Sequence, residues 1–180
     1  MWNLPNLLSL FRILLVPILV VVLLTEFDGS AFIGLGLFLL AALTDFLDGY
    51  IARRRQQVTN LGKLLDPAAD KILTSAAFIS LVGLGLADAW LVVVIVSREF
   101  IVSGLRSVAA SQNKVLAASA SGKVKTVTQI VAISLLIIKD QLGEFQILAP
   151  LSLWVAVVVT IYSGVEYLAR NAHVLLEEST

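Results

Sequence analysis

The sequence has 180 residues, of which 58% are hydrophobic and 14% are charged, with 13 basic and 13 acidic residues. Soluble domains are typically about 45–50% apolar and about 25% charged, so this composition excludes an ordinary water-soluble protein and indicates repeated membrane crossing. The zero net charge leads us to expect no nucleic-acid partner, and the lack of cysteine excludes disulfides, zinc–thiolate sites and a cysteine nucleophile. The length allows one domain, which we expect to cover residues 1–180.

The apolar segments predict an all-α polytopic membrane protein with six transmembrane helices. A short interfacial helix is expected first, because MWNLPNLLSLFR can place Trp2 and several leucines on one face. Several of the spans are shorter than the ~20 residues of a full crossing, and polar residues that face a cavity would complete them. The spans are expected at about residues 13–24, 31–50, 66–86, 89 to beyond 106, 122–138 and 147–168.

Four aspartates lie at the facing ends of the second and third spans. They are spaced three and four residues apart within each pair, so each pair shares one helix face. An aspartate near the bilayer core costs roughly 2.5–3.5 kcal/mol on insertion scales, and four together need a compensating charge. Carboxylates suit hard divalent cations such as Mg²⁺ or Mn²⁺, as one ion or as two bridged ions. The alternative is that the acids cap helices and pair with nearby basic residues. The aspartates are Asp45, Asp48, Asp66 and Asp70.

The aspartates belong to a longer pattern, D-x-x-D-G-x-x-A-R, eight further residues, then G-x-x-x-D-x-x-x-D. This pattern resembles the signature of the CDP-alcohol phosphatidyltransferase family, with every fixed position filled. Members of that family are integral membrane enzymes that move a phosphatidyl or similar group from a CDP-linked donor to an alcohol and release CMP. The matching residues are Asp45, Asp48, Gly49, Ala52, Arg53, Gly62, Asp66 and Asp70.

The resemblance assigns expected roles. We expect two divalent ions per active site, Mg²⁺ or Mn²⁺, held by the four aspartates, with Asp70 also taking the proton of the acceptor hydroxyl. The glycines and alanine of the signature let a nucleotide approach the backbone, and Arg53 offers a guanidinium fork to phosphate. From the residues alone, helix capping is the favoured explanation of the Pro-Asn-x-x-Ser element, but such an element is common near the N-terminus of these enzymes, and the resemblance implies a role in the CDP site. The expected CDP-diacylglycerol-binding residues are Asn6, Ser9, Gly49, Ala52, Arg53, Thr59 and Gly62.

A second polar cluster is predicted on the fourth and fifth spans. Arg98 and Glu99 interrupt a long apolar run, and Arg106 follows two turns later near the same face. Lys123 and Lys125 lie at the beginning of the fifth span. These four cations, together with the N-terminus of the fifth span, predict an anion pocket that binds a phosphate. The alternatives are a simple Arg98–Glu99 ion pair and two lysines that anchor the helix at the membrane surface.

The segments SREFIVSGLR and GKVKT resemble the bacterial phosphatidylglycerophosphate-synthase branch of the family, with Ser97 where alanine is usual. This resemblance implies CDP-diacylglycerol as donor, glycerol 3-phosphate as acceptor, and a homodimer formed through transmembrane helices. Arg98, Arg106, Lys123 and Lys125 would then bind glycerol 3-phosphate. Inositol phosphate fits the same cations, whereas serine carries no phosphate. A divalent-cation transporter is the alternative from another class, although the arginines beside the acids disfavour it.

Basic residues flank one set of predicted loops. Of the 13 lysines and arginines, only Lys139 lies in the opposite loops. The positive-inside rule therefore places both termini and the aspartates on the cytoplasmic side of a bacterial inner membrane.

Overall fold

The computed structural model describes the backbone of residues 4–25, 27–55, 60–112, 116 and 119–176, and the side chains of residues 7–25, 27–44, 68–112, 116 and 119–171. These residues form helices and no strand, which confirms the all-α prediction. The helices are α1 (Leu4–Leu24), α2 (Ser30–Arg55), α3 (Asn60–Gly83), α4 (Ala89–Ser111), α5 (Ala120–Ile137), the 3₁₀ helix η1 (Lys139–Phe145) and α6 (Leu148–Leu176).

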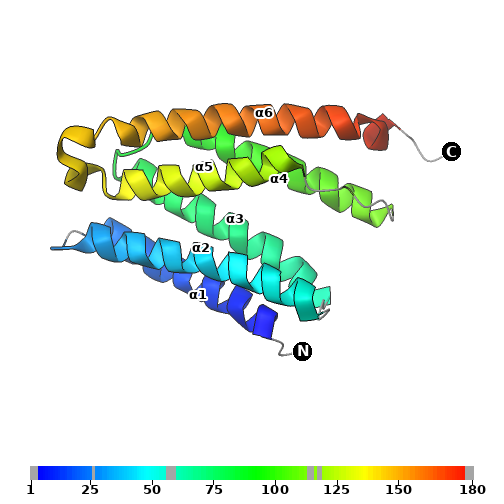
Figure 1. Cartoon of the computed structure of the whole chain (residues 1–180), viewed down its shortest axis with the longest axis horizontal. Helices are drawn as coiled ribbons and strands as arrows, with labels where there is room; N and C mark the ends of the chain where they lie inside the picture. Colours follow the sequence, from blue (N-terminus) through cyan, green and yellow to red (C-terminus); the bar gives the residue numbers. More distant parts are fainter. Residues whose placement is uncertain (1–3, 26, 56–59, 113–115, 117–118, 177–180) are drawn as a thin grey trace.

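The α-helices form two groups of three that run up and down (Figure 1). In the first group α1 packs against α2 and α3, and in the second α6 packs against α4 and α5. Contacts of α3 with α4 and α5, and of α2 with α5, join the two groups. Both termini lie at one end, which also holds the α2–α3 and α4–α5 connections, and the other three turns lie at the opposite end (Figure 1). The carboxyl end of α2 and the amino ends of α3 and α5 therefore share the end with the termini.

Three helices in the described part of the chain contain a stretch long and apolar enough to cross a bilayer: Leu7–Leu24, Ala120–Ile137 and Leu148–Asn171. The α2, α3 and α4 helices have 26, 24 and 23 residues, which at 1.5 Å per residue is about 35–39 Å and exceeds a hydrocarbon core of about 30 Å. Among the described residues of α2, the apolar stretch covers Ser30–Thr44, and charged residues interrupt the sequences of α3 and α4. The six-span prediction is thus supported for three helices and stays a prediction for the others.

The separate interfacial helix expected before residue 13 is corrected by the structure. Residues from Leu4 onward continue into the first span as one 21-residue helix, with Pro17 inside it. A proline removes one backbone hydrogen bond, but membrane helices tolerate this because the neighbouring backbone re-satisfies the freed groups. Ser9 therefore lies inside α1, in the same helix as the first span.

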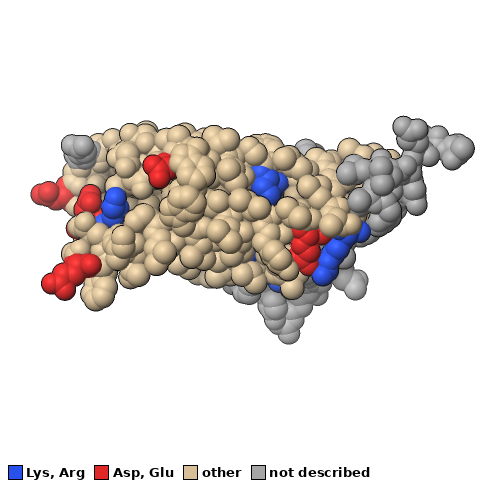
Figure 2. All heavy atoms as spheres, turned by 90° about the horizontal axis from the view of Figure 1, so that it is seen from above, with Lys and Arg blue, Asp and Glu red and all other residues tan. Residues whose placement is uncertain are grey.

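The turn from α3 to α4 is closed by a Schellman motif. Leu86 donates its N–H to the carbonyl of Leu81 at 2.9 Å, and Gly85 donates to Val82 at 3.0 Å. Gly85 has a φ of 70°, which costs glycine little because it has no Cβ. This turn belongs to an end that carries the exposed acids Asp28, Asp88, Asp140 and Glu144, and Figure 2 shows acidic side chains gathered there.

The packed interior runs through both groups, and Phe38, Phe78 and Ile133 are fully buried in it. Large apolar side chains also cover the outside, where Ile79, Val127 and Ile161 are exposed, as expected of a surface that meets lipid.

Truncating a buried core residue should lower the stability of the protein. Phe78→Ala leaves a cavity at a side chain with 0% exposure, and such changes typically cost about 3–5 kcal/mol. We expect a clearly lower melting temperature in detergent and an unchanged KM for either substrate in the folded fraction. Ile79→Ala is the matched control, because Ile79 is 61% exposed and should change the melting temperature little. Equal losses from the two variants would contradict this packing.

Candidate active site

The two helices that carry the aspartates bring them to the same depth in the bundle. Asp45 and Asp48 lie ten and seven residues before the end of α2, and Asp66 and Asp70 lie six and ten residues after the start of α3. At 1.5 Å per residue, all four backbone positions are about 9–15 Å from the α2–α3 connection. Because α2 and α3 pack together in opposite directions, the two pairs are level with each other. A set of four carboxylates at one depth fits a hard divalent cation.

The structure describes the side chain of Asp70, which is half-buried. Apart from Ser9, the other candidate residues of the metal and nucleotide site have side chains outside the described set, and Thr59 lies outside it altogether. The convergence of the aspartates on one ion therefore stays a prediction. The residues concerned are Asn6, Asp45, Asp48, Gly49, Ala52, Arg53, Thr59, Gly62 and Asp66.

The structure shows a buried cation on α1, Arg12, that sequence reasoning did not identify. Ser9 and Arg12 lie three residues apart, on one face of α1, and both have 0% exposure. A buried guanidinium needs an opposing negative charge. The helices that pack on α1 are α2 and α3, which carry the four aspartates. The position of Arg12 inside the NLLSLFR segment, one turn after Ser9, was the available signal.

Glu99 is the centre of a buried polar network between α4 and α5. Its Oε1 accepts hydrogen bonds from Lys125 Nζ at 2.6 Å, from Arg98 Nη1 at 3.4 Å and from Gln129 Nε2 at 3.4 Å. The side chains of Arg98, Glu99 and Lys125 are only 12%, 10% and 8% exposed. One carboxylate thus pairs with two cations, and the group of three side chains retains a net positive charge. The predicted Arg98–Glu99 pairing is present, but it neutralises only part of the cluster.

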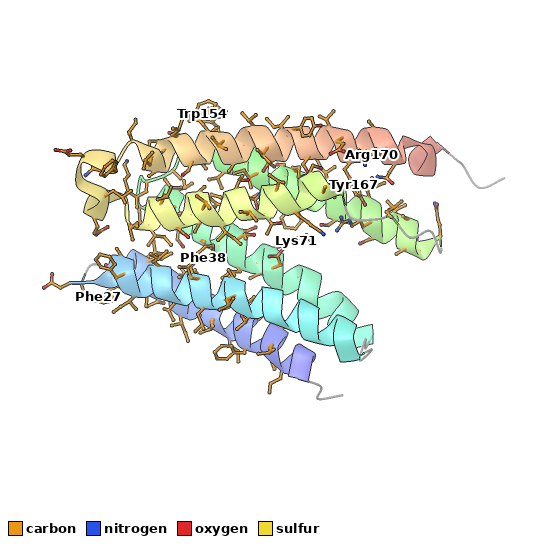
Figure 3. The ribbon with its side chains drawn as sticks, in the orientation of Figure 1. Phe27, Phe38, Lys71, Trp154, Tyr167 and Arg170 are labelled. Atoms are coloured by element: carbon orange, nitrogen blue, oxygen red, sulfur yellow. The ribbon has the colours of Figure 1, made fainter. Side chains whose placement is uncertain are left out.

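One face of α6 completes this network. Thr160, Ser163 and Tyr167 are all buried, and their spacing of three and four places them in a row along the helix. Ser163 Oγ accepts from Arg98 Nη2 at 2.7 Å, and Tyr167 Oη accepts from Arg106 Nε at 3.0 Å. The Arg106 guanidinium also lies 5.1 Å from the centre of the Tyr167 ring, labelled in Figure 3. Sequence reasoning did not identify this row, although its helical spacing was visible.

The four predicted phosphate-binding cations have different surroundings. Arg98 and Lys125 meet at Glu99, and Arg106 is exposed but held by Tyr167. Lys123 is exposed at the beginning of α5. The structure therefore brings Arg98 and Lys125 together, holds Arg106 separately against Tyr167 of α6, and places Lys123 at the surface.

Lys71 connects this cationic group to the helix that carries Asp66 and Asp70. The charges of Asp70, Glu99, Lys125 and Arg106 all act on the Lys71 ammonium. Lys71 is on α3 and is labelled in Figure 3. The catalytic aspartate proposed from the sequence and the cationic network on α4–α6 therefore lie within electrostatic reach of one side chain.

Gly164 provides room for Arg98. A Cβ at this position would lie 3.0 Å from Arg98 Cγ, which is tighter than ordinary van der Waals contact. We therefore expect Gly164→Ala to displace Arg98 by a few tenths of an ångström and to raise the KM for a phosphate-bearing acceptor several-fold. Gly104→Ala on α4 is the control, because nothing lies within 4 Å of its added Cβ. An unchanged acceptor KM in Gly164→Ala would show that the position of Arg98 does not matter.

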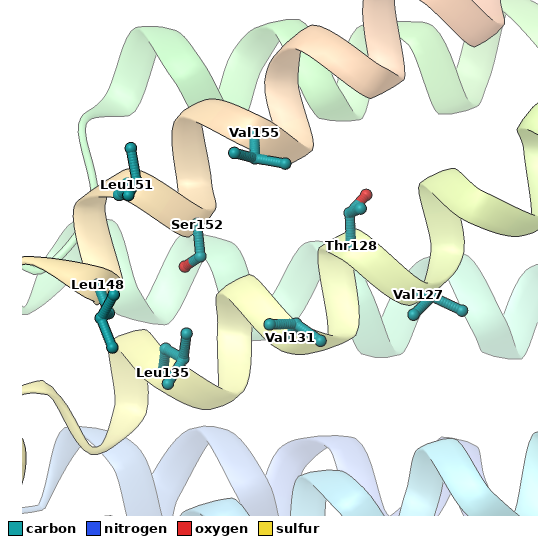
Figure 4. Close-up of a pocket in the computed structure, with 8 residues that line it drawn as sticks. All are labelled: Val127, Thr128, Val131, Leu135, Leu148, Leu151, Ser152 and Val155. Atoms are coloured by element: carbon teal, nitrogen blue, oxygen red, sulfur yellow. The ribbon is translucent and has the colours of Figure 1, made fainter.

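An apolar groove on α5 and α6 shares no residue with this network. Figure 4 shows its lining, which includes Val127, Val131, Leu151 and Val155 and has no charged side chain. These four residues are exposed on the outer surface. The groove therefore faces the surroundings of the bundle, and the polar chemistry lies elsewhere.

Residues 2–162 match the model of a protein family described as CDP-alcohol phosphatidyltransferase. The chain belongs to this family. The matched segment contains the complete aspartate signature and ends just before Ser163. Membership in the CDP-alcohol phosphatidyltransferase family favours a transferase over the cation-transporter hypothesis.

Several curated members of the CDP-alcohol phosphatidyltransferase family resemble the chain over nearly its full length. It is 48% identical to the CDP-diacylglycerol–glycerol-3-phosphate 3-phosphatidyltransferase of Bacillus subtilis, over 95% of this chain and 96% of that protein. The proteins of the same name from Rickettsia felis and Salmonella choleraesuis are 38% and 37% identical, over 92% and 98% of this chain and 93% and 99% of their own lengths.

Proposed function

We propose that this protein transfers the phosphatidyl group of CDP-diacylglycerol to sn-glycerol 3-phosphate and releases CMP, so that phosphatidylglycerophosphate forms. The observation that carries the acceptor assignment is the buried group of Arg98 and Lys125 on a single carboxylate, with Arg106 of the same helix as Arg98 held by Tyr167. Such a group retains positive charge in a setting where unpaired charge is costly. A phosphate monoester carries about −1.5 to −2 charge at neutral pH and would balance it. The similar relatives are named for this same reaction.

The aspartates of α2 and α3 are the residues that would hold a divalent metal, Mg²⁺ or Mn²⁺, with two ions per site. Their level arrangement on two packed helices and their oxygen-only chemistry support this role. Bound metal would supply positive charge that neutralises the diphosphate of the donor and the departing CMP. Asp45, Asp48 and Asp66 serve as ligands, and Asp70 is a ligand at the edge of the site.

CDP-diacylglycerol is bound by small residues of the signature and by one guanidinium group. Gly49, Ala52 and Gly62 let the cytidine nucleotide approach the helix backbone, and Arg53 binds a phosphate. Thr59 and Asn6 add polar contacts, and the buried hydroxyl of Ser9 faces the same group of helices. The acyl chains of the donor remain in the bilayer, because the outside of the bundle is apolar.

The acceptor is positioned by cations and activated by one carboxylate. Arg98, Arg106 and Lys125 bind its phosphate, and Lys123 guides it from the surface. Asp70 takes the proton of the C1 hydroxyl as that oxygen attacks the phosphorus attached to diacylglycerol. The new oxygen–phosphorus bond forms while the bond from that phosphorus to the CMP oxygen breaks, and CMP leaves with the bonding electrons. No covalent enzyme intermediate is required.

The whole chain acts as one membrane domain, assembled as a homodimer in the bacterial inner membrane. It crosses the bilayer six times, with both termini and the aspartates on the cytoplasmic side. Two observations support this orientation: the basic residues flank the loops at one end, and both termini lie at that end (Figure 1). Soluble phosphorylated acceptors are available on that side.

An acceptor panel tests the proposed reaction. Purified protein in detergent receives CDP-diacylglycerol, Mg²⁺ and one of glycerol 3-phosphate, inositol phosphate, serine or glycerol, and CMP release is measured. We expect release to be fastest by at least about tenfold with glycerol 3-phosphate, because its phosphate pairs with the buried cations. Faster release with inositol phosphate would keep the chemistry and change the acceptor, and equal release with glycerol would remove the phosphate-binding role.

A further inference from the structure

The polar row on α6 is unusual because its three hydroxyl groups are buried. Thr160, Ser163 and Tyr167 have 0%, 0% and 1% exposure, and burying hydroxyl groups without partners costs free energy. Each of the three accepts a hydrogen bond from a side chain of α4 or α5. The row therefore serves the side chains of the neighbouring helices, and its hydroxyls do not bond to the backbone of α6.

The two arginines of α4 are each held by one residue of this row. Arg98 donates a hydrogen bond from Nη1 to Glu99 Oε1 and from Nη2 to Ser163 Oγ, so both outer nitrogens of its guanidinium are fixed. Arg106 uses Nε on Tyr167 and lies against the ring of the same residue, which leaves its outer nitrogens for another partner. Arginine side chains carry about 2 kcal/mol of rotamer entropy. Fixing them in the folded protein lowers the entropy lost when an anion binds.

We propose that Ser163 and Tyr167 are positioning residues of the acceptor-phosphate subsite, acting through Arg98 and Arg106. This inference rests on the proposed function, because it assigns the phosphate of the acceptor as the ligand of the two arginines. Ser163 and Tyr167 do not touch the substrate. They set the direction of the guanidinium groups. Ser163 and Tyr167 are four residues apart, about one turn of α6, and the two arginines are eight residues apart, about two turns of α4, so each pair shares one helix face.

Two conservative variants test this role. Ser163→Ala removes only the hydroxyl that receives Arg98, and Tyr167→Phe removes only the hydroxyl that receives Arg106 while the ring remains. We expect each to raise the KM for glycerol 3-phosphate by about five- to twentyfold, because a hydrogen bond to a charged group is lost. The KM for CDP-diacylglycerol and the melting temperature should stay near the wild-type values. Ser152→Ala and Tyr162→Phe are matched controls on α6, since Ser152 bonds to the Ala149 carbonyl and Tyr162 is exposed.

A double-variant comparison separates positioning from a purely structural role. In an Arg106→Ala background, Tyr167→Phe should cause no further rise in the acceptor KM, because the arginine through which it acts is absent. A purely structural contribution of the tyrosine hydroxyl would add its full effect in that background. An additive result, or a parallel rise in the KM for CDP-diacylglycerol, would overturn the proposal.

Equilibrium binding measurements test the positioning role of Ser163 and Tyr167 without relying on turnover. Calorimetry with glycerol 3-phosphate and with inorganic phosphate should show binding to the wild-type protein and weaker binding to Ser163→Ala and Tyr167→Phe. Suppose that the wild-type protein binds phosphate and the variants bind it less tightly, but no transfer to glycerol 3-phosphate occurs. The proposed function then fails, and the positioning role stands. If wild-type and variant proteins bind both anions equally, or bind neither, the positioning role is overturned.

Discussion

Asp70→Asn is expected to lower phosphatidyl transfer by about 10²–10⁴-fold, the range that general-base catalysis contributes. Asparagine keeps the size of the side chain and one oxygen, but it cannot accept the acceptor's proton. Asp70 has a half-buried side chain on α3, and its charge acts on Lys71 together with the charges of Glu99, Lys125 and Arg106. Asp70 therefore lies within electrostatic reach of the side chain that also senses the cationic group. The measurement is CMP release under saturating concentrations of both substrates.

The control for Asp70→Asn is Asp88→Asn, an exposed acid at the opposite end of the bundle, which should leave turnover unchanged. CDP binding by Asp70→Asn, followed by calorimetry in Mg²⁺, should stay within a few-fold of wild type. Retained turnover in Asp70→Asn would exclude it as the base. Loss of CDP binding together with turnover would instead assign Asp70 chiefly to the metal site.

The second large effect is expected at Lys125, and it should differ from that at Lys123. Lys125→Met removes a buried ammonium that donates to Glu99 at 2.6 Å, and hydrogen bonds to charged groups are worth about 1.5–3 kcal/mol. We therefore expect the KM for glycerol 3-phosphate to rise about ten- to 150-fold. Lys123→Met removes an exposed lysine of the same helix turn and should change that KM by no more than about threefold, because exposed charges are screened.

Two further measurements on Lys125→Met and Lys123→Met check that the fold and donor binding are retained. Glu99 retains Arg98 as a partner when Lys125 is replaced, so the fold should survive, and the melting temperature checks this. The KM for CDP-diacylglycerol should be similar in both variants. Equal effects of the two lysines on the acceptor KM would show that their contribution is general attraction of anions at the surface, and the buried network would lose its assigned role.

Long apolar segments made the helices predictable, but their ends were less so. The second helix continues past Tyr50 to Arg55, and the third begins at Asn60, because arginines and other helix-forming residues extend a helix beyond its apolar part. The fifth helix begins at Ala120, where Ser119 Oγ accepts a hydrogen bond from the N–H of Gly122. Hydrophobicity detects the membrane-crossing part of a helix and misses its polar ends.

The candidate site was predictable where it depends on local spacing. The aspartate pairs follow from spacings of three and four within single helices. The difference in exposure between Lys123 and Lys125 was also predictable, because residues two apart lie on different sides of a helix. By contrast, Glu99 meets Lys125 across 26 positions, and Arg98 meets Ser163 across 65. Such contacts depend on the packing of α4, α5 and α6, which the sequence pattern of one helix does not specify.

Incorporation of labelled glycerol 3-phosphate into lipid is the most direct measurement of the central claim. Wild-type protein in detergent receives radiolabelled sn-glycerol 3-phosphate, CDP-diacylglycerol and Mg²⁺, and the chloroform-soluble label and released CMP are counted together. The account predicts one labelled lipid per CMP, with two phosphates per diacylglycerol by mass spectrometry, and at least about 100-fold less labelled lipid with Asp70→Asn. Release of CMP without label in the lipid fraction, or with phosphatidate as the lipid product, would contradict it.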